Sequence, residues 1–243
     1  MIGSLAERVF EEIYRAASGT GDLELRDDRT GRGDTDYLLL NGRGRQVFRI
    51  NIKFHGSLFQ KAREMVGLEP EDCFALATYK IHSALQKQEK EHLPYVFLIV
   101  GVPGLTGTVV GAHLPEDLVH LSAISQETPI AGKRAIEDQI VARTAAAPAS
   151  FAAERVITEY TEGIRQARWF VLSARRADNL LRHHLFHRVY ALRVRGFSRN
   201  YRNAELDMHF SLAQDLLPLA EFLRVLREEG LPSLLGRLER GTF

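Results

Sequence analysis

The chain is poor in cysteine and in long apolar segments. Cys73 is its only cysteine, which excludes an internal disulfide bond and a cysteine-based metal cluster. The longest apolar run, residues 95–100, is far shorter than the roughly 20 residues that a membrane-spanning helix needs. Residues 1–10 lack a basic region followed by a long apolar stretch, so we expect no signal peptide. These absences predict a cytoplasmic protein that does not enter a membrane.

Familiar nucleotide and hydrolase motifs are also missing. The chain contains no GxxxxGK[ST] phosphate-binding loop and no GxSxG turn around a nucleophilic serine. What is present is an ordinary globular composition: of 243 residues, 45% are hydrophobic and 26% are charged. This composition is enough to bury one large core or two modest ones.

Positive charge is concentrated in one stretch, although the formal net charge of the chain is only +1. Residues 165–202 contain ten arginines, one aspartate, no lysine and no glutamate, so this stretch has a net charge of +9 and the remainder −8. Such a tract is typical of a surface that binds a phosphate backbone. Two alternatives remain open: a solvated surface, and a tract that pairs with the acidic remainder of the chain.

The first hundred residues predict an alternation of helices and strands. Residues 4–17 place Leu5, Val9 and Ile13 on one helical face, and Ser4 followed by Glu7 resembles a capping box. Asn41-Gly42 predicts a hairpin between two strands. Strands are expected at 23–26, 36–40, 46–54 and 95–101, helices at 58–66 and 77–92, and loops at 27–34 and 68–72.

The second half is less regular. Helices are expected at 133–147, 151–166, 174–185 and 212–229, the last of them interrupted or bent at Pro218, and strands at 169–172, 189–194 and 204–210. We predict two domains, 1–112 and 113–243, with one continuous fold as the alternative.

Three polar residues on neighbouring predicted strands form a candidate site. Asp36 begins one strand, and Asn51 and Lys53 lie two residues apart on the next, so the amide and the amine leave the same face. Glu7 lies on the first helix. Phosphodiester hydrolysis uses such a set, because oxygen ligands hold Mg²⁺ and a nearby lysine orients the attacking water. Each residue also has a non-catalytic interpretation. Asp36 is then a turn residue, Glu7 a helix-capping residue, and Asn51 and Lys53 ordinary polar residues of a strand.

In element order and in these residues, the chain resembles the PD-(D/E)xK nuclease superfamily. Thr35-Asp36 and Asn51-Ile52-Lys53 are similar to its signature, with Thr35 in place of the usual proline. Glu7-Arg8 and Arg26 make the beginning similar to archaeal Holliday-junction resolvases. The resemblance covers roughly residues 3–101. It implies a restriction-endonuclease-like αβββαβ core with a mixed central sheet. The elements expected in the second half add a mostly helical α+β extension, so we predict an α/β protein.

One residue departs from the superfamily pattern. Asn51 stands where the signature has an acidic residue, so it can offer a metal only a neutral carbonyl oxygen. Two hypotheses follow. Either Asp34, Asp36 or Glu7 compensates and the enzyme cleaves, or the site is inactive and the fold only binds nucleic acid.

We therefore predict a DNA endonuclease that requires Mg²⁺ or Mn²⁺ and that functions in restriction, repair or phage defence, with a homodimer as a plausible assembly. The alternatives are an inactive nucleic-acid-binding protein and a non-catalytic subunit of a larger complex. Asp36, Asn51 and Glu7 would hold the metal, and Lys53 would position the water. Candidate nucleic-acid contacts are polar or cationic residues beside the motif and in the arginine tract: Arg26, His55, Lys80, Arg175, Arg176, Arg195 and Arg199.

Overall fold

Two sheets with helices packed around them make up the described part of the protein. The computed structural model describes residues 2–17, 23–29, 35–54, 58–59, 61–101, 161–187, 192–195 and 205–240. Within these ranges, no helix has both the length and the apolar character needed to cross a membrane. The predicted helix at 133–147, most of that at 151–166 and the predicted domain boundary lie outside the described residues, although residues 161–166 are helical.

The larger sheet has six strands, and its order in space is β1-β2-β3-β5-β6-β9. Strands β3 and β5 are parallel, and the other neighbours are antiparallel. The protein is thus mixed α/β with a mostly antiparallel central sheet. Its strands are β1 (Leu23–Asp27), β2 (Tyr37–Asn41), β3 (Gln46–Phe54), β5 (Tyr95–Gly101), β6 (Arg168–Ser173) and β9 (Leu217–Pro218).

The hairpin between β2 and β3 forms where the sequence predicts it. The Asn41 side-chain oxygen accepts hydrogen bonds from the backbone N–H groups of Arg43 and Arg45, both at 3.0 Å. Gly44 has a φ of 71°, which a glycine adopts without strain. This turn fixes the register of β3 against β2, and with it the position of Asn51 and Lys53 relative to Asp36.

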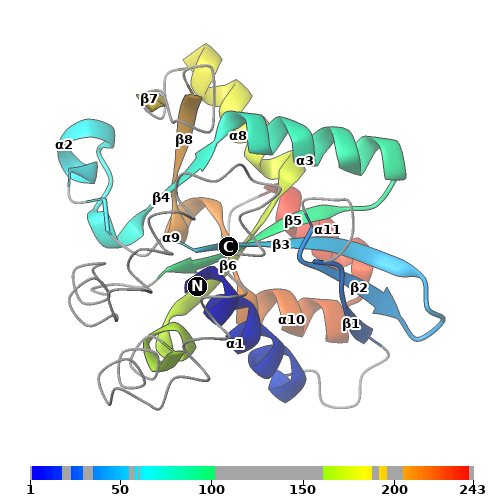
Figure 1. The fold of residues 1–243 in the computed structure, drawn as a ribbon. Helices are drawn as coiled ribbons and strands as arrows, with labels where there is room; N and C mark the ends of the chain where they lie inside the picture. The colour runs from blue at the N-terminus through cyan, green and yellow to red at the C-terminus, as the bar shows by residue number, and fades with distance from the viewer. Residues whose placement is uncertain are drawn as a thin grey trace.

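Helices cover both faces of the larger sheet (Figure 1). The apolar residues of α1 (Ile2–Ala17), α10 (Leu219–Glu228) and α11 (Leu231–Arg240) pack in one core cluster, and those of α3 (Thr78–Glu91) and α8 (Ala174–His187) pack in the other. The predicted helical face of α1 is confirmed, since Val9 is buried. The predicted capping box is wrong, because the helix already begins at Ile2 and Ser4 lies inside it.

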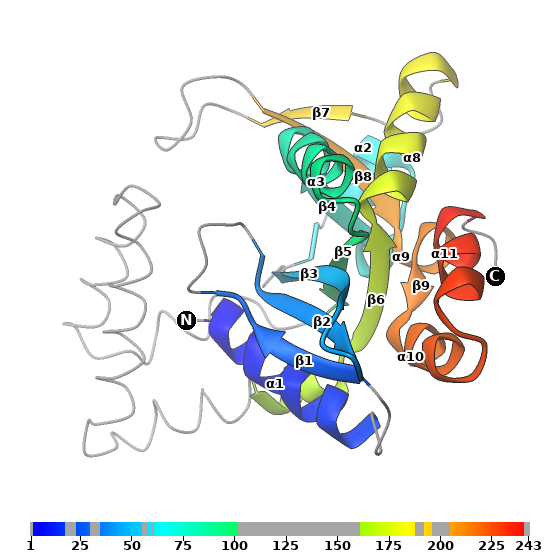
Figure 2. The same cartoon turned by 90° about the vertical axis from the view of Figure 1, so that its right-hand side faces the viewer.

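A second sheet of three antiparallel strands lies on the same side as α3 and α8 (Figure 2). Its order is β4 (Cys73–Ala77), β8 (Glu205–Ser211) and β7 (Leu192–Arg195). Strands β7 and β8 confirm two predicted strands, whereas β4 was missed. A carboxylate oxygen of Asp72 accepts a hydrogen bond from the backbone N–H of Ala213 at 2.8 Å, which ties the start of β4 to the end of β8. Each of the two sheets thus contains strands from before residue 102 and strands from after residue 160.

The predictions for three short segments are confirmed only in part. The helix expected at 58–66 is confined to α2 (Ala62–Val66), and a 3₁₀ turn (Pro70–Asp72) replaces the expected loop. The helix expected at 212–229 is interrupted at Pro218, as predicted, and the segment forms α9 (Leu212–Asp215), the strand β9 and α10. Pro218 ends the short strand, and α10 begins at the next residue, because proline cannot donate the backbone hydrogen bond that a continuous helix requires.

Candidate functional site

Asp36 lies directly before β2, at the edge of β3. Its backbone N–H donates to the carbonyl oxygen of Ile50 at 3.0 Å. Its carboxylate Oδ2 accepts a hydrogen bond from the backbone N–H of Ile52 at 2.6 Å. Since Ile52 is the residue between Asn51 and Lys53, this bond places the carboxylate beside the Asn-Ile-Lys segment. The structure thus brings the first predicted residue to the strand that holds the other two.

Asn51 and Lys53 point to the face of the sheet that α3 and α8 cover. On the parallel strand β5 their register partners are Phe97 and Ile99, which belong to the core beneath α3 and α8. Asn51 is only 5% exposed, and Lys53 is half-buried. Burial of a neutral amide costs less free energy than burial of a carboxylate, so asparagine suits this position where an acid would need a compensating cation.

The buried hydroxyl of Thr35, next to Asp36, accepts hydrogen bonds from two cationic side chains. Thr35 is 2% exposed, and its Oγ1 accepts hydrogen bonds from Lys87 Nζ at 3.1 Å and from Arg49 Nη1 at 3.3 Å. Lys87 comes from α3 and Arg49 from β3. Among the residues that the structure describes, Thr35 is the hydrogen-bonding partner of Lys87, and no carboxylate pairs with this ammonium.

Arg49 differs from Lys87 in its acidic partners. Its Nη1 lies 3.2 Å from a carboxylate oxygen of Asp28, and its Nε contacts the carboxylate of Glu91. The charge of Arg49 is therefore offset within the protein, whereas the ammonium of Lys87 has a neutral partner among the described residues and can pair with an incoming anion. The sequence does not identify Arg49 or Lys87 as site residues. Their contacts with Thr35 join β3, α3 and the segment before β2, which no local sequence pattern relates.

Glu7 reaches the same end of the sheet from the opposite face. Arg29 Nη1 pairs with its carboxylate at 2.8 Å, and the hydroxyl of Tyr37 donates to its backbone carbonyl at 3.3 Å. Tyr37 is paired with Ile50, and both belong to the core beneath α1. Because successive strand residues alternate between faces, Asn51 and Lys53 point away from that side. The structure does not bring Glu7 onto their face.

Glu7 belongs instead to an ionic cluster around Arg29, here called the arginine network. Arg29 also lies 3.5 Å from a carboxylate oxygen of Glu11, contacts the carboxylate of Asp27, and stacks its guanidinium over the ring of Tyr37. Hydrogen bonds to Asp27 and Glu7 raise the pKa of Arg29, against the opposing effect of burial. Burial, followed by the hydrogen bond to Glu11, raises the pKa of the Tyr37 phenol.

Two other predicted contacts, Arg26 and Lys80, have described side chains. Arg26 is exposed on β1, opposite Leu38, which in turn is opposite Arg49, so Arg26 shares the face of Asn51 and Lys53. The ammonium of Lys80 lies 5.9 Å from the centre of its neighbour's ring on α3. His55 and Arg199 lie outside the described residues, as does the side chain of Arg195.

In the arginine tract, the side chains of Arg165, Arg168, Arg175, Arg176 and Arg182 are described, and each contacts an acidic residue. The contacts are Arg165 with Glu12 at 2.8 Å, Arg168 with the backbone carbonyl of Glu71 at 3.2 Å, Arg175 with Glu239 at 2.8 Å, Arg176 with Asp215 at 3.9 Å and Arg182 with Asp178 at 2.7 Å. Arg165, Arg175 and Arg176 thus pair with carboxylates outside the tract, and for these three the structure favours the alternative that the tract pairs with the acidic remainder. Arg182 pairs within the tract, and the contact of Arg168 is with a backbone carbonyl.

Asp36 and Asn51 offer a magnesium ion only the minimum number of protein ligands. Mg²⁺ is commonly held by one or two carboxylates, with water and phosphate oxygens completing its shell. Asp36 supplies one carboxylate and Asn51 one amide carbonyl. Within the described ranges, no group of three or more acidic, histidine or cysteine side chains is placed to hold a metal ion.

In comparisons with known proteins, the chain matches no family model, no curated protein and no solved structure.

Proposed function

We propose that the protein is a divalent-metal-dependent nuclease that hydrolyses phosphodiester bonds in DNA. The observation that best supports this proposal is the hydrogen bond from Ile52 to the Asp36 carboxylate, which holds an acid beside Asn51 and Lys53. The surrounding elements agree with it: with β4 and the short helices set aside, α1, β1, β2, β3, α3 and β5 follow the αβββαβ order of the PD-(D/E)xK nucleases.

In this proposal each residue has one role. Asp36 and the carbonyl of Asn51 hold Mg²⁺ or Mn²⁺, which supplies charge stabilisation at the phosphate. Lys53 orients the water whose oxygen bonds to phosphorus as the bond to the leaving oxygen breaks. Lys87 and the exposed Arg26 pair with phosphate oxygens on either side. A homodimer and a role in restriction, repair or phage defence follow by analogy with that superfamily alone.

Cleavage assays with plasmid and oligonucleotide substrates, with Mg²⁺ or Mn²⁺ titrated, test this function. We expect Lys53→Ala to lower the cleavage rate by about 10²-fold or more, as for loss of a positioned acid–base group. Lys90→Ala is the matched control, because Lys90 is exposed on α3. Cleavage by Lys53→Ala at the wild-type rate would refute the catalytic assignment.

A second candidate function is nucleic-acid binding without catalysis on the same fold. It is favoured by the neutral Asn51 in the acidic position and by the ion pair that holds Glu7 on the other face of the sheet. Under this function the wild type binds DNA without cleaving it, and its affinity falls steeply with salt. Asn51→Asp should then gain affinity for Mn²⁺, measured by calorimetry. Wild-type protein that shows no salt-dependent DNA binding would contradict both functions and favour a subunit of a larger complex.

A further inference from the structure

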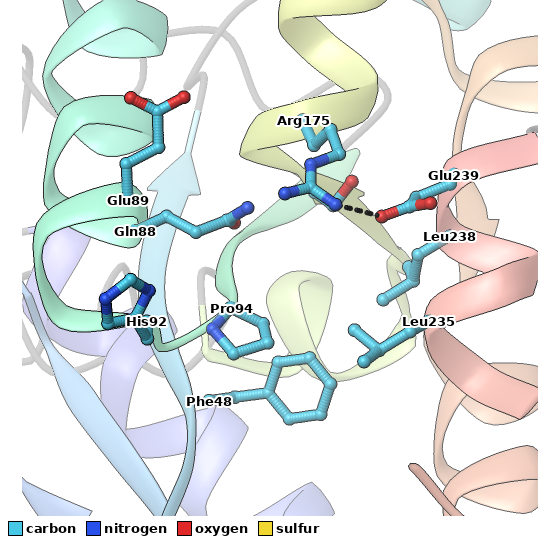
Figure 3. A pocket seen from close by; sticks show the side chains of 10 residues that line it. Phe48, Gln88, Glu89, His92, Pro94, Arg175, Leu235, Leu238 and Glu239 are labelled. Atoms are coloured by element: carbon cyan, nitrogen blue, oxygen red, sulfur yellow. Dashed lines mark hydrogen bonds and ion pairs between the residues drawn. The ribbon is translucent and has the colours of Figure 1, made fainter. Parts of the chain in front are cut away.

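A pocket lies at the end of the larger sheet where β3 and β5 begin, away from Asn51 and Lys53. Its volume is about 390 Å³, within the range of small-molecule sites. Its walls come from the C-terminal part of α3, the beginning of α8 and residues 235–239 of α11 (Figure 3). Arg175, a nucleic-acid contact predicted from the sequence, lines it, but Asp36, Asn51 and Lys53 do not. The pocket is therefore a separate place where a ligand can bind.

One side of this pocket is apolar. Leu235 and Leu238 extend from α11 toward Pro94, and the buried ring of Phe48 lies at the base (Figure 3). Leu235 is only partly buried, so its side chain presents apolar surface to the opening. Walls of this kind favour a ligand with apolar faces, because they remove such faces from water without requiring hydrogen bonds.

The opposite side holds an amide whose orientation is fixed. The side-chain oxygen of Gln88 accepts a hydrogen bond from the backbone N–H of Tyr95 at 3.0 Å. A backbone N–H can pair only with the oxygen of an amide, so the NH₂ group of Gln88 is the end that faces the opening (Figure 3). The pocket thus presents a preorganised donor on the wall that faces its apolar side.

An ion pair closes the rim with balanced charge. Arg175 Nη1 lies 2.8 Å from a carboxylate oxygen of Glu239. A free anion would have to displace Glu239 from Arg175, and a purely aliphatic ligand would remove the ion pair and the Gln88 amide from water without replacing their hydrogen bonds. A neutral ring with donors and acceptors along its edge meets neither penalty.

We propose that this pocket binds a nucleobase, with the faces of the ring against Pro94 and Leu235 and its polar edge toward Gln88 and the Arg175–Glu239 pair. Purines and pyrimidines combine flat apolar faces with adjacent donors and acceptors, and proteins that bind an unstacked base contact it in this way. The base belongs either to a free nucleoside or to an unpaired position of a bound strand.

The proposal is tested with the full chain in metal-free buffer by isothermal titration of adenosine, guanosine, cytidine and thymidine, each at roughly millimolar concentration. Benzoate is the charged comparison ligand, and a short single-stranded oligonucleotide represents a base within a strand. Leu235→Trp fills the pocket. Gln88→Leu removes the amide at similar volume, and Gln86→Leu is its control, because Gln86 is exposed on the same helix.

We expect at least one nucleoside to bind, Leu235→Trp to abolish that binding, and Gln88→Leu to weaken it roughly fivefold to tenfold while Gln86→Leu leaves it unchanged. Binding of the oligonucleotide alone, lost in Leu235→Trp, assigns the pocket to a base within a strand. Tighter binding of benzoate than of every nucleoside overturns the proposal, and so does binding that Leu235→Trp does not affect. These nucleosides contain no phosphate, so the result is independent of whether the protein cleaves DNA.

Discussion

At one end of the larger sheet, the two faces satisfy their charged groups in different ways. On the α1 face, Arg29 is surrounded by the carboxylates of Glu7, Glu11 and Asp27. On the α3 face, Lys87 is held by the neutral hydroxyl of Thr35. The first arrangement uses its charges to hold helix and strands together. On the α3 face Arg49 also pairs with acids, but among the described residues Lys87 has a neutral partner, which suits a surface that binds phosphate.

The comparison also separates two kinds of polar residue that look alike in the sequence. Glu7 and Asp36 are both acids near the predicted motif, yet the carboxylate of Glu7 pairs with an arginine, whereas that of Asp36 accepts a backbone N–H. Under the proposed function, the α1 face stabilises the fold and the polar residues beside Asp36 on the α3 face contact DNA. Substitutions in the core and the arginine network of the α1 face should therefore reduce stability, and substitution of Lys87 on the α3 face should reduce DNA affinity.

The largest effect is expected in the aromatic core beneath α1. Phe10 is 1% exposed, and its ring lies 6.0 Å from that of Tyr14, 5.6 Å from that of Tyr37 and 6.1 Å from that of Trp169. Phe10→Ala should lower the free energy of unfolding by about 3–5 kcal/mol, because it removes buried contacts and leaves a cavity. Urea denaturation measures the loss. The exposed Met65 provides the control, and a loss no larger than that of Met65→Ala would contradict a structural α1 face.

A smaller loss is expected from the arginine network. Arg29→Met should lower the free energy of unfolding by about 1–2 kcal/mol, because three neighbouring carboxylates lose their shared cation. The control is Arg63→Met, which breaks an exposed pair with Glu69 and should cost less than about 1 kcal/mol. Both are measured by denaturation at low salt. Equal losses in the two variants would show that the network adds nothing beyond a surface ion pair.

Local sequence patterns predicted the strands around Asp36 and two strands of the second sheet, but not β4. Strand β3 alternates apolar and polar residues, and Asn41-Gly42 marks its hairpin, so both are visible in the residues themselves. Strand β4 has only five residues and pairs with β8, which lies more than a hundred residues further along the chain. Pairing at that separation depends on tertiary contacts, which local propensity cannot supply.

The same limit applies to the candidate site. The two-residue spacing of Asn51 and Lys53 sets their common face, which the structure retains. The hydrogen bond of Lys87 to Thr35 joins residues 52 positions apart, and the ion pair of Arg29 with Glu7 joins residues 22 apart. Neither contact follows from a repeat or a spacing rule. Only the packing of α3 and α1 against the sheet reveals which polar residues share the site.

On the α3 face, Lys87→Met should change stability by less than about 1 kcal/mol, because it removes one partly exposed hydrogen bond. DNA affinity should fall about threefold to tenfold, and the salt dependence of binding should weaken by roughly one phosphate contact. Fluorescence anisotropy with a labelled oligonucleotide at several salt concentrations measures both. Lys90→Met, on the exposed side of the same helix, serves as the control. Identical salt slopes in the two variants would remove Lys87 from the interface.

The smallest effect at neutral pH is expected for Tyr14, on the α1 face. Its hydroxyl donates to the carbonyl of Leu23 at 3.1 Å, and burial raises the pKa of the phenol to about 12. The unfolded chain loses this proton near pH 10, whereas the folded chain keeps it, so stability should fall as the pH rises from about 10 to about 12. Tyr14→Phe should flatten that decline and cost only about 0.5–1 kcal/mol at neutral pH. Urea unfolding at successive pH values measures the slope, with Tyr79→Phe, exposed on α3, as the control. An alkaline slope as steep in Tyr14→Phe as in the control would contradict this prediction. It would show that burial beneath α1 does not hold the Tyr14 phenol in its neutral form.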